Sequence, residues 1–286
     1  MSEGMNNNQR DSYLICVDSD GSAVDSMTIK HVQAFGPAFI ETFLIEERKD
    51  DILQEWNRLN LYSMERGLNR FEGLAKIVDY TNQNVQPIEG AHRLIEAVQN
   101  AEELNVQLFE KLYAAEDELI FKQAIDYSAR VNQRIRAIPI ADIVAFDYVE
   151  ETLKKAAEFA DIVVVSSANK KAVEEEWRRL GIAAYIQEVF TQEDGTKAQV
   201  IARLIKEKGY ALDHVLKIGD AKGDFEAAQH NQVAFYPILV NQESQSWRAL
   251  HDTYLYQFQS GSFGKEQEQL NHAFIMNLTR EDEKEE

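Results

Sequence analysis

Three stretches of the chain differ in how their apolar residues are spaced. Residues 13–17 form a short, partly β-branched apolar run, which predicts a buried strand. From about residue 28 to about residue 137, apolar residues recur at helical spacing in segments rich in Ala, Glu, Leu, Gln and Arg. Residues 139–238 instead alternate apolar runs with helical stripes. The strands predicted there are 161–165, 184–190, 214–219 and 233–238, and the helices are 146–159, 171–180, 197–209 and 225–230.

This alternation of strand and helix is the pattern of a parallel sheet covered by helices. The first strand meets its partners only after about a hundred residues of helix, which favours an insertion into a discontinuous core. We therefore predict an α/β core of residues 11–25 and 140–245, with an all-helical domain of residues 26–139 inserted after the first strand. Residues 246–286 are predicted to form a C-terminal helical extension that packs on the core and ends in an acidic tail.

Carboxylates follow two of the predicted strands. Asp18 and Asp20 come directly after the first strand, and Asp220 and Asp224 follow the strand over residues 214–219. Ligands of open α/β sheets bind at the carboxyl ends of the strands, so we expect these side chains to meet. Two like charges held this close usually share a cation. Taken alone, the Asp-x-Asp pair is better explained as a turn that ends a strand.

Two serines and one lysine could complement the charge of these carboxylates. Ser166 and Ser167 end the strand over residues 161–165, and Lys197 begins a helix. Clustered carboxylates need a hard cation, and Mg²⁺ suits oxygen ligands together with a phosphate. Without a cation, each unit-charge pair between carboxylate and phosphate would cost about 4 kcal/mol at about 4 Å and an effective dielectric constant near 20. With a cation, one carboxylate can attack phosphorus, a second can transfer a proton, and Ser166 can hold phosphate oxygens.

The charge and composition of the chain limit which partners and which cellular location we expect. The formal charge is −19, from 30 basic and 49 acidic residues, which argues against nucleic acid as a partner. No apolar stretch approaches the roughly 20 residues of a membrane span, and the polar first eleven residues lack signal-peptide features. We therefore expect a cytoplasmic protein without membrane association. The single cysteine, Cys16, excludes an internal disulfide, and its place within the first strand favours a buried small hydrophobe over a nucleophile.

Four motifs together resemble those of the haloacid dehalogenase superfamily. The helical insertion also falls where that family places its cap domain, between the first and second motifs. The resemblance implies a Rossmann-like parallel-sheet core with an inserted helical cap, Mg²⁺ as cofactor, and a small phosphorylated metabolite as substrate. In family order, the motifs are Asp-Ser-Asp-Gly-Ser at residues 18–22, Val-Val-Val-Ser at residues 163–166, Lys197, and Gly-Asp-Ala-Lys-Gly-Asp at residues 219–224.

The resemblance also implies roles for the catalytic residues. Asp18 matches the nucleophile, Asp20 the general acid and base, and Lys197 the lysine that bridges phosphate and nucleophile. Ser166 and Ser167 match the phosphate-binding segment. The metal ligands implied by the resemblance are Asp18, Asp20, Asp220 and Asp224.

The second aspartate, Asp20, separates branches of the family. Dehalogenases and phosphonate-cleaving members lack it, so its presence implies a phosphoglycolate phosphatase-like enzyme that hydrolyses a phosphate monoester through an aspartyl phosphate. A phosphomutase acting on a sugar phosphate would also keep Asp20. A non-catalytic binding or regulatory protein could share the fold, although the intact motifs count against it.

Substrate choice is expected to depend on the inserted domain. Its most suggestive segment is the loop over residues 66–71, which carries Arg66 and Arg70 around a glycine. Arg70 is a candidate substrate-binding residue on this basis. The alternative is a pair of solvated basic residues at a helix junction, and the sequence leaves that alternative open.

Overall fold

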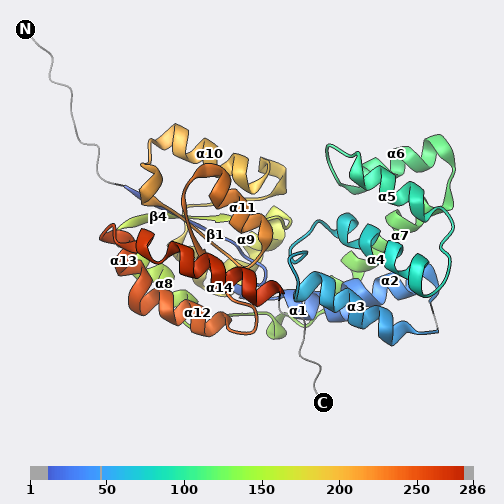
Figure 1. Cartoon of the computed structure of the whole chain (residues 1–286), viewed down its shortest axis with the longest axis horizontal. Coiled ribbons are helices and arrows are strands. Elements are labelled where there is room, and N and C mark those ends of the chain that lie inside the picture. The colour runs from blue at the N-terminus through green and yellow to red at the C-terminus, as the bar shows by residue number, and fades with distance from the viewer. Residues whose placement is uncertain (1–11, 46, 280–286) are drawn as a thin grey trace, which may run out of the picture. The chain divides into compact units, whose positions relative to one another are not determined.

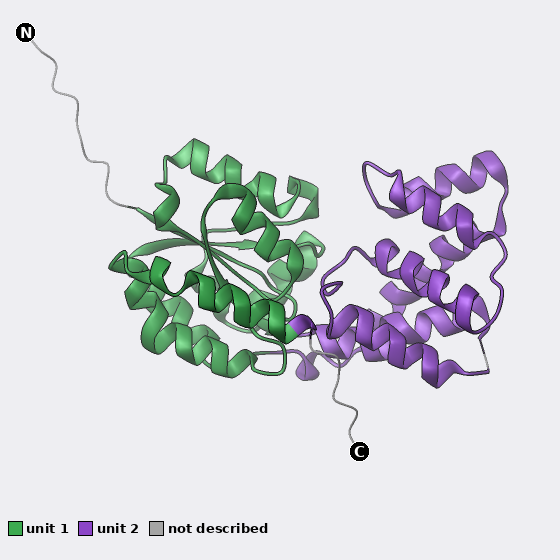
Figure 2. Cartoon of the chain, in the orientation of Figure 1, with its two compact units in different colours: residues 1–24, 145–277 green, residues 25–144, 278–286 purple. Residues whose placement is uncertain are grey.

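The computed structural model describes residues 12–45 and 47–279, and the chain divides into two compact units (Figure 2). The divisions fall at residues 24/25, 144/145 and 277/278. We call the unit that contains residues 145–277 the α/β unit and the unit that contains residues 25–144 the helical unit. The predicted N-terminal segment before residue 12 and the acidic tail after residue 279 lie outside the described residues.

A five-stranded parallel sheet forms the centre of the α/β unit, with the strand order β5-β4-β1-β6-β7. The near-continuous apolar sequence of β1 suits this central place, since both of its faces are covered, and Leu14 to Val17 are fully buried. The predicted parallel sheet is therefore confirmed. The strands are β1 (Tyr13–Val17), β4 (Ala160–Val165), β5 (Glu188–Phe190), β6 (Val215–Gly219) and β7 (Ala234–Pro237).

Helices cover both faces of this sheet (Figure 1). Side chains of α10 and α11 pack against Leu14 and Cys16 of β1, which confirms that Cys16 is a buried apolar residue. Trp247 of α12 is fully buried, and its indole N–H donates to the carbonyl of Ser22 at 2.8 Å. The helices are α8 (Val149–Ala156), α9 (Lys170–Arg179), α10 (Lys197–Lys208), α11 (Lys222–Asn231), α12 (Glu243–Ala249), α13 (Leu255–Gln259) and α14 (Gln267–Thr279).

Several predicted elements are shorter in the structure. The strand predicted over residues 184–190 is reduced to Glu188–Phe190, because a 3₁₀ turn over Ile182–Tyr185 follows the left-handed Gly181. The helix predicted over residues 146–159 begins only at Val149. A short pair of strands, β2 (Val24–Asp25) and β3 (Val144–Ala145), has no clear signal in the sequence.

The helical unit consists of helices around its own apolar core, as the helical spacing of residues 28–137 predicts. Among the described residues, no helix is both long enough and apolar enough to span a bilayer. That this unit acts as a cap domain stays a prediction. The helices are α1 (Met27–Lys30), α2 (Gly36–Phe43), α3 (Lys49–Leu61), α4 (Arg70–Asn84), α5 (Ala91–Gln99), α6 (Val106–Glu116) and α7 (Leu119–Ala137), with a π-helical turn over His31–Phe35 between α1 and α2.

Candidate active site

Three buried carboxylates meet at the carboxyl edge of the sheet. Asp18 follows β1, Asp220 follows β6, and Asp224 lies in the first turn of α11. Each offers an oxygen within 4.8 Å of the others, and none is more than 5% exposed. They meet because β1 and β6 are neighbouring parallel strands, and the backbone N–H of Asp18 donates to the carbonyl of Ile218 at 3.0 Å. Three of the four carboxylates that we expected to meet therefore lie together, and Asp20 is not part of this cluster among the described residues.

Gly219 makes room for one of these carboxylates. A Cβ atom at this position would lie 2.3 Å from Cγ of Asp224, so any other residue would force the Asp224 side chain to move. The glycine that ends β6 therefore has a steric reason: it lets the first turn of α11 bring Asp224 against the strand.

Two lysines connect the carboxylates into a chain of ion pairs. Nζ of Lys197 lies 3.0 Å from Oδ2 of Asp18 and 2.7 Å from Oδ1 of Asp224. On the other side of Asp224, Nζ of Lys217 lies 2.8 Å from the same Oδ1. Asp224 thus holds two ammonium groups on one oxygen, while its Oδ2 accepts from the N–H of Ala221 at 3.3 Å.

Lys217 is the functional residue that sequence reasoning missed. Its side chain is completely buried in β6, and Nζ also donates to the carbonyl of Ile218 at 3.0 Å. The available signal was a single lysine within the apolar run Val215-Leu216-Lys217-Ile218. Lysines are almost never fully buried without a partner, so this one predicts a buried carboxylate nearby.

The carboxylates differ in how readily they ionise. Burial and the neighbouring charge of Asp224 raise the pKa of Asp18 to about 7, although Lys197 and Lys217 oppose the rise. Burial alone would also raise the pKa of Asp224, but its two lysine partners hold it below the ordinary value. Asp224 is therefore the permanent anion that fixes Lys197, and Asp18 is the carboxylate whose ionisation depends on a further cation.

This pKa predicts a pH-dependent stability of the metal-free protein. An ordinary aspartate titrates near 3.8, so between about pH 4 and about pH 7 the native state binds more protons than the unfolded state. The free energy of unfolding should therefore fall as the pH rises through this window. Asp18→Asn removes the titrating group. The difference in free energy of unfolding between this variant and wild type should therefore shift in favour of the variant by about 2 to 3 kcal/mol from pH 5 to pH 8. Urea unfolding in EDTA at both pH values measures this, and a difference that stays constant with pH would contradict it.

The donor set of the site fits a hard divalent cation. Three buried carboxylates outnumber the two ammonium groups beside them, so the site as a whole favours additional positive charge. All of the candidate ligand atoms are oxygens, which Mg²⁺ prefers over nitrogen or sulfur donors. Asp18, Asp220 and Asp224 lie close enough together to surround an ion, but Asp224 already receives two ammonium groups, so it suits fixing Lys197 better than the predicted role of metal ligand.

The remaining predicted residues lie around this cluster or away from it. Asp20 is half-buried in the turn after β1, where it forms a β-bridge with Val24. Ser166 is buried after β4, next to β1 in the sheet, and its hydroxyl accepts from the N–H of Ala168 at 3.2 Å. Ser167 is exposed. The catalytic and phosphate-binding roles of these residues stay predictions.

Arg70 belongs to the helical unit, where it begins α4. Its guanidinium bonds to Ser128 and Asn132 of α7 within the same unit. These contacts exclude the alternative of a simply solvated basic residue at a helix junction. A role in substrate binding stays a prediction.

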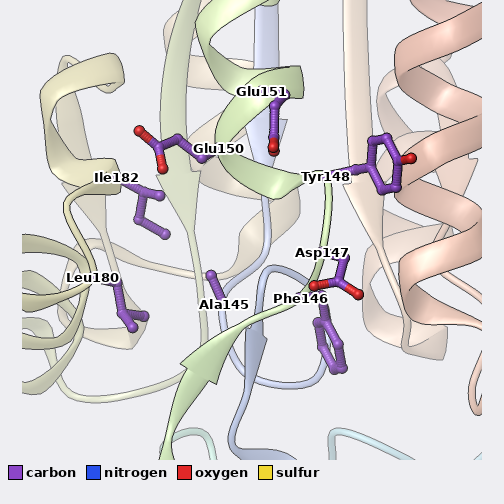
Figure 3. Close-up of a pocket in the computed structure, with 8 residues that line it drawn as sticks. All are labelled: Ala145, Phe146, Asp147, Tyr148, Glu150, Glu151, Leu180 and Ile182. Atoms are coloured by element: carbon purple, nitrogen blue, oxygen red, sulfur yellow. The ribbon is translucent and has the colours of Figure 1, made fainter.

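A pocket of about 450 Å³ lies elsewhere in the α/β unit (Figure 3). Figure 3 shows three carboxylates around it, from Asp147, Glu150 and Glu151, and Glu150 accepts a hydrogen bond from the hydroxyl of Tyr185 at 3.1 Å. None of the predicted site residues lines this pocket, so it is separate from the carboxylate cluster. Its wall is completed by Ala145, Phe146, Tyr148, Leu180 and Ile182.

Two solved structures share the fold of this chain. A haloacid dehalogenase-like family hydrolase from Streptococcus pneumoniae has a TM-score of 0.50 at 13% identity, over 83% of this chain and 91% of its own. A protein from Lactobacillus delbrueckii subsp. bulgaricus, whose description gives phosphoglycolate phosphatase as a provisional activity, has a TM-score of 0.51 at 13% identity, over 79% of this chain and 84% of its own. Among curated protein sequences, none matches the chain.

The structural similarity shows only a shared fold, whereas a match to a family model shows the protein family. The model of haloacid dehalogenase-like hydrolases matches residues 68–238, which include the second, third and fourth motifs. Asp18 and Asp20 lie before the matched range, so their assignment rests on the geometry described above and on the resemblance of their motif. The match extends over more than half of the chain, and the chain belongs to the family of haloacid dehalogenase-like hydrolases.

Proposed function

We propose that the protein is a Mg²⁺-dependent phosphatase that hydrolyses a small phosphate monoester through an aspartyl-phosphate intermediate. The observation that carries the proposal is the position of Lys197, whose Nζ lies 3.0 Å from Oδ2 of the buried Asp18. A carboxylate that is buried, flanked by a fixed ammonium group and clustered with Asp220 and Asp224 is suited to attack a phosphoryl group. An ordinary structural aspartate needs none of these features.

In the first half of the reaction, Asp18 would act as the nucleophile. Its Oδ–P bond forms while the ester P–O bond breaks, and Asp20 gives its proton to the departing alcohol oxygen. Lys197 neutralises charge between the carboxylate and the phosphoryl oxygens as they approach each other. The hydroxyl of Ser166 and backbone N–H groups near it would hold the equatorial oxygens.

In the second half, water attacks phosphorus and the P–Oδ bond of Asp18 breaks. The proton lost by the water returns to Asp20, so the enzyme ends as it began and inorganic phosphate is released. Bound Mg²⁺ would supply positive charge against the phosphoryl oxygens and keep Asp18 ionised. Asp18, Asp220 and the backbone carbonyl of Asp20 would hold it, while Asp224, occupied by two lysines, would fix Lys197.

Phosphate release tests the proposal directly. The purified full chain is assayed with Mg²⁺ and with EDTA against a panel of sugar phosphates, nucleotides and phosphorylated carboxylic acids. We expect Mg²⁺-dependent release of phosphate from at least one class. Isomerisation of a sugar phosphate without release would identify a phosphomutase, and the absence of either reaction would favour a binding or regulatory role.

The proton transfer assigned to Asp20 predicts a dependence on the leaving group. Asp20→Asn is expected to lower kcat for alkyl phosphates by about 10² to 10⁴-fold, since it removes a general acid. An aryl phosphate such as 4-nitrophenyl phosphate needs little protonation of its leaving oxygen, so the loss in its first step should be much smaller. Single-turnover rates for both substrates measure this difference. Equal losses for the two substrates would argue against Asp20 as the acid.

A further inference from the structure

The residue between Asp18 and Asp20 is held by a tryptophan from a distant helix. Ser19 is completely buried, and its hydroxyl accepts a hydrogen bond from the indole N–H of Trp177 in α9 at 2.9 Å. Trp177 is also completely buried and lies 158 positions further along the chain. Ser19 shares one peptide bond with each aspartate, so a shift of Ser19 would move both carboxylates. We call residues 18–22 the aspartate loop.

The carbonyl group of Ser19 is fixed as firmly as its hydroxyl. It accepts from the backbone N–H groups of Ser22, Ala23 and Val24 at distances between 2.9 and 3.2 Å. The turn that brings these donors back onto Ser19 passes through Gly21, whose φ of 77° is in the left-handed region that favours glycine. Ser19 is therefore the point about which the turn closes, and the indole fixes that point from outside the turn.

A second tryptophan holds the far end of the aspartate loop. The indole N–H of Trp247 in α12 donates to the carbonyl of Ser22 at 2.8 Å, and both residues are completely buried. They are 225 positions apart in the chain, and α12 follows the last strand of the sheet. The C-terminal helices therefore contribute a direct contact to the turn that carries Asp20.

Trp247 is itself anchored to other parts of the α/β unit. The hydroxyl of Tyr236 in β7 donates to the carbonyl of the preceding residue, Ser246, at 2.7 Å. The hydroxyl of Ser246 accepts from the backbone N–H of Leu239 at 3.1 Å, and the hydroxyl of Thr152 in α8 lies 3.4 Å from the carbonyl of Trp247. The position of this indole is thus set by contacts that do not involve the aspartate loop.

A purely structural explanation is that a buried indole needs an acceptor wherever it lies. Trp56 illustrates this in the helical unit, where its N–H donates to Nδ1 of His31 at 3.1 Å. Trp177 and Trp247 differ from Trp56, because two separate helices direct their donors at the same short loop. That convergence favours positioning of the loop over the mere satisfaction of two donors.

We propose that Trp177 and Trp247 are positioning residues that hold Asp18 and Asp20 in place for the reaction. The inference rests on the proposed function, in which Asp18 attacks phosphorus and Asp20 transfers a proton. A displacement of about 1 Å can lower a rate by about 10²-fold, so a loop that carries both groups has to be held rigidly. The backbone carbonyl of Asp20 is also a proposed ligand of Mg²⁺, so the same contacts should affect binding of the ion.

Hydrogen exchange tests the positioning without any enzymatic assay. In the metal-free full chain, the backbone N–H groups of Ala23 and Val24, which donate to Ser19, should be protected. Ser19→Ala removes the acceptor of the Trp177 indole and should speed exchange of both groups by about tenfold or more. Trp56→Phe removes another buried indole, in the helical unit, and should leave these rates unchanged. Unchanged rates in Ser19→Ala, or an equal increase throughout the α/β unit, would overturn the proposal.

The rate of phosphate release separates positioning from overall stability. The matched change on the indole is 3-benzothienylalanine at position 177, which keeps the shape of tryptophan and has sulfur in place of the N–H. This change and Ser19→Ala should each lower kcat by at least about tenfold, with KM within about threefold of wild type. The two changes combined should lose no more than the larger single loss, since both break the same hydrogen bond. Losses that multiply, or that appear only in KM, would contradict the positioning role.

Trp247 is tested only from the indole side, because its acceptor is a main-chain carbonyl. The same analogue at position 247 should lower kcat by at least about tenfold and leave KM nearly unchanged. It should also speed exchange of the Ala23 and Val24 N–H groups. A kcat within threefold of wild type would refute the role of Trp247.

The affinity for Mg²⁺ keeps this inference separate from the phosphatase proposal. It is measured from the backbone signals of Ala23 and Val24 as Mg²⁺ is added to the ¹⁵N-labelled full chain, so it needs no turnover. Ser19→Ala should weaken it by about threefold or more, and Trp56→Phe should not change it. If no substrate is hydrolysed, the phosphatase proposal fails, while faster exchange and weaker Mg²⁺ binding would still support the two tryptophans as supports of the loop. If phosphate is released and Ser19→Ala changes neither exchange nor Mg²⁺ affinity, this inference fails alone.

Discussion

Asp18→Asn is expected to lower kcat for phosphate release by about 10⁴-fold or more, the scale seen when a covalent nucleophile is removed. An amide oxygen is a poor nucleophile, and the variant also lacks one charged oxygen for the metal. The loss should appear on every substrate that the wild type accepts, because the same phosphorus atom is attacked in each. Phosphate release over the substrate panel, with Mg²⁺ in excess, measures it.

The control for this variant is an aspartate in the same unit that lies away from the site. Asp213 is exposed in the turn before β6, and Asp213→Asn should keep wild-type activity. The fold of Asp18→Asn should also survive, since Lys197 keeps its contact with Asp224. Activity within tenfold of wild type in Asp18→Asn would remove Asp18 as the nucleophile. A second test is acid-stable ³²P transfer to protein, which should be absent in the variant.

The sheet and the carboxylate cluster could be predicted from the sequence because both depend on short local patterns. Each pattern is an apolar run followed by a polar residue, and in a parallel sheet the ends of such runs lie at the same edge. Asp18 and Asp220 are far apart in the chain, yet each directly follows an apolar run. Once the two runs are neighbouring parallel strands, their ends meet at one edge. Lys197 was predictable for the same reason, since it begins the helix that leads into β6.

Other features could not be predicted because they depend on packing between distant segments. The partners of Arg70 on α7 lie 58 and 62 residues further along the chain, so a loop sequence gives no sign that its guanidinium is held there. The π-helical turn that positions Phe35 has no compositional signal. Lys217 lies in an apolar strand where a charged side chain is unexpected, and only the structure reveals that Asp224 receives it.

Lys217→Met is expected to lower the free energy of unfolding by about 3 kcal/mol, the lower end of the range for breaking a buried ion pair. The substitution leaves Asp224 with Lys197 as its remaining cation, in a place where neither carboxylate oxygen is accessible to water. Methionine fills a similar volume, so the loss reflects charge and hydrogen bonding more than packing. Urea unfolding at pH 7 in EDTA measures it. Lys222→Met is the control, because that lysine is about half exposed, pairs with Glu226 and should change stability by less than about 0.5 kcal/mol.

A second substitution distinguishes the loss of the ion pair from a general disturbance of β6. In Lys217→Met with Asp224→Asn, the carboxylate that needs the lysine is gone, so the double variant should be more stable than the sum of the single losses predicts. The same double variant should remain poorly active, because Lys197 has lost the anion that holds it 3.0 Å from Asp18. A double variant that is stable and as active as Asp224→Asn alone would mean that Lys217 serves catalysis only through Asp224. Additive losses would instead mean that Lys217 contributes to packing in β6 and has no specific coupling to the site.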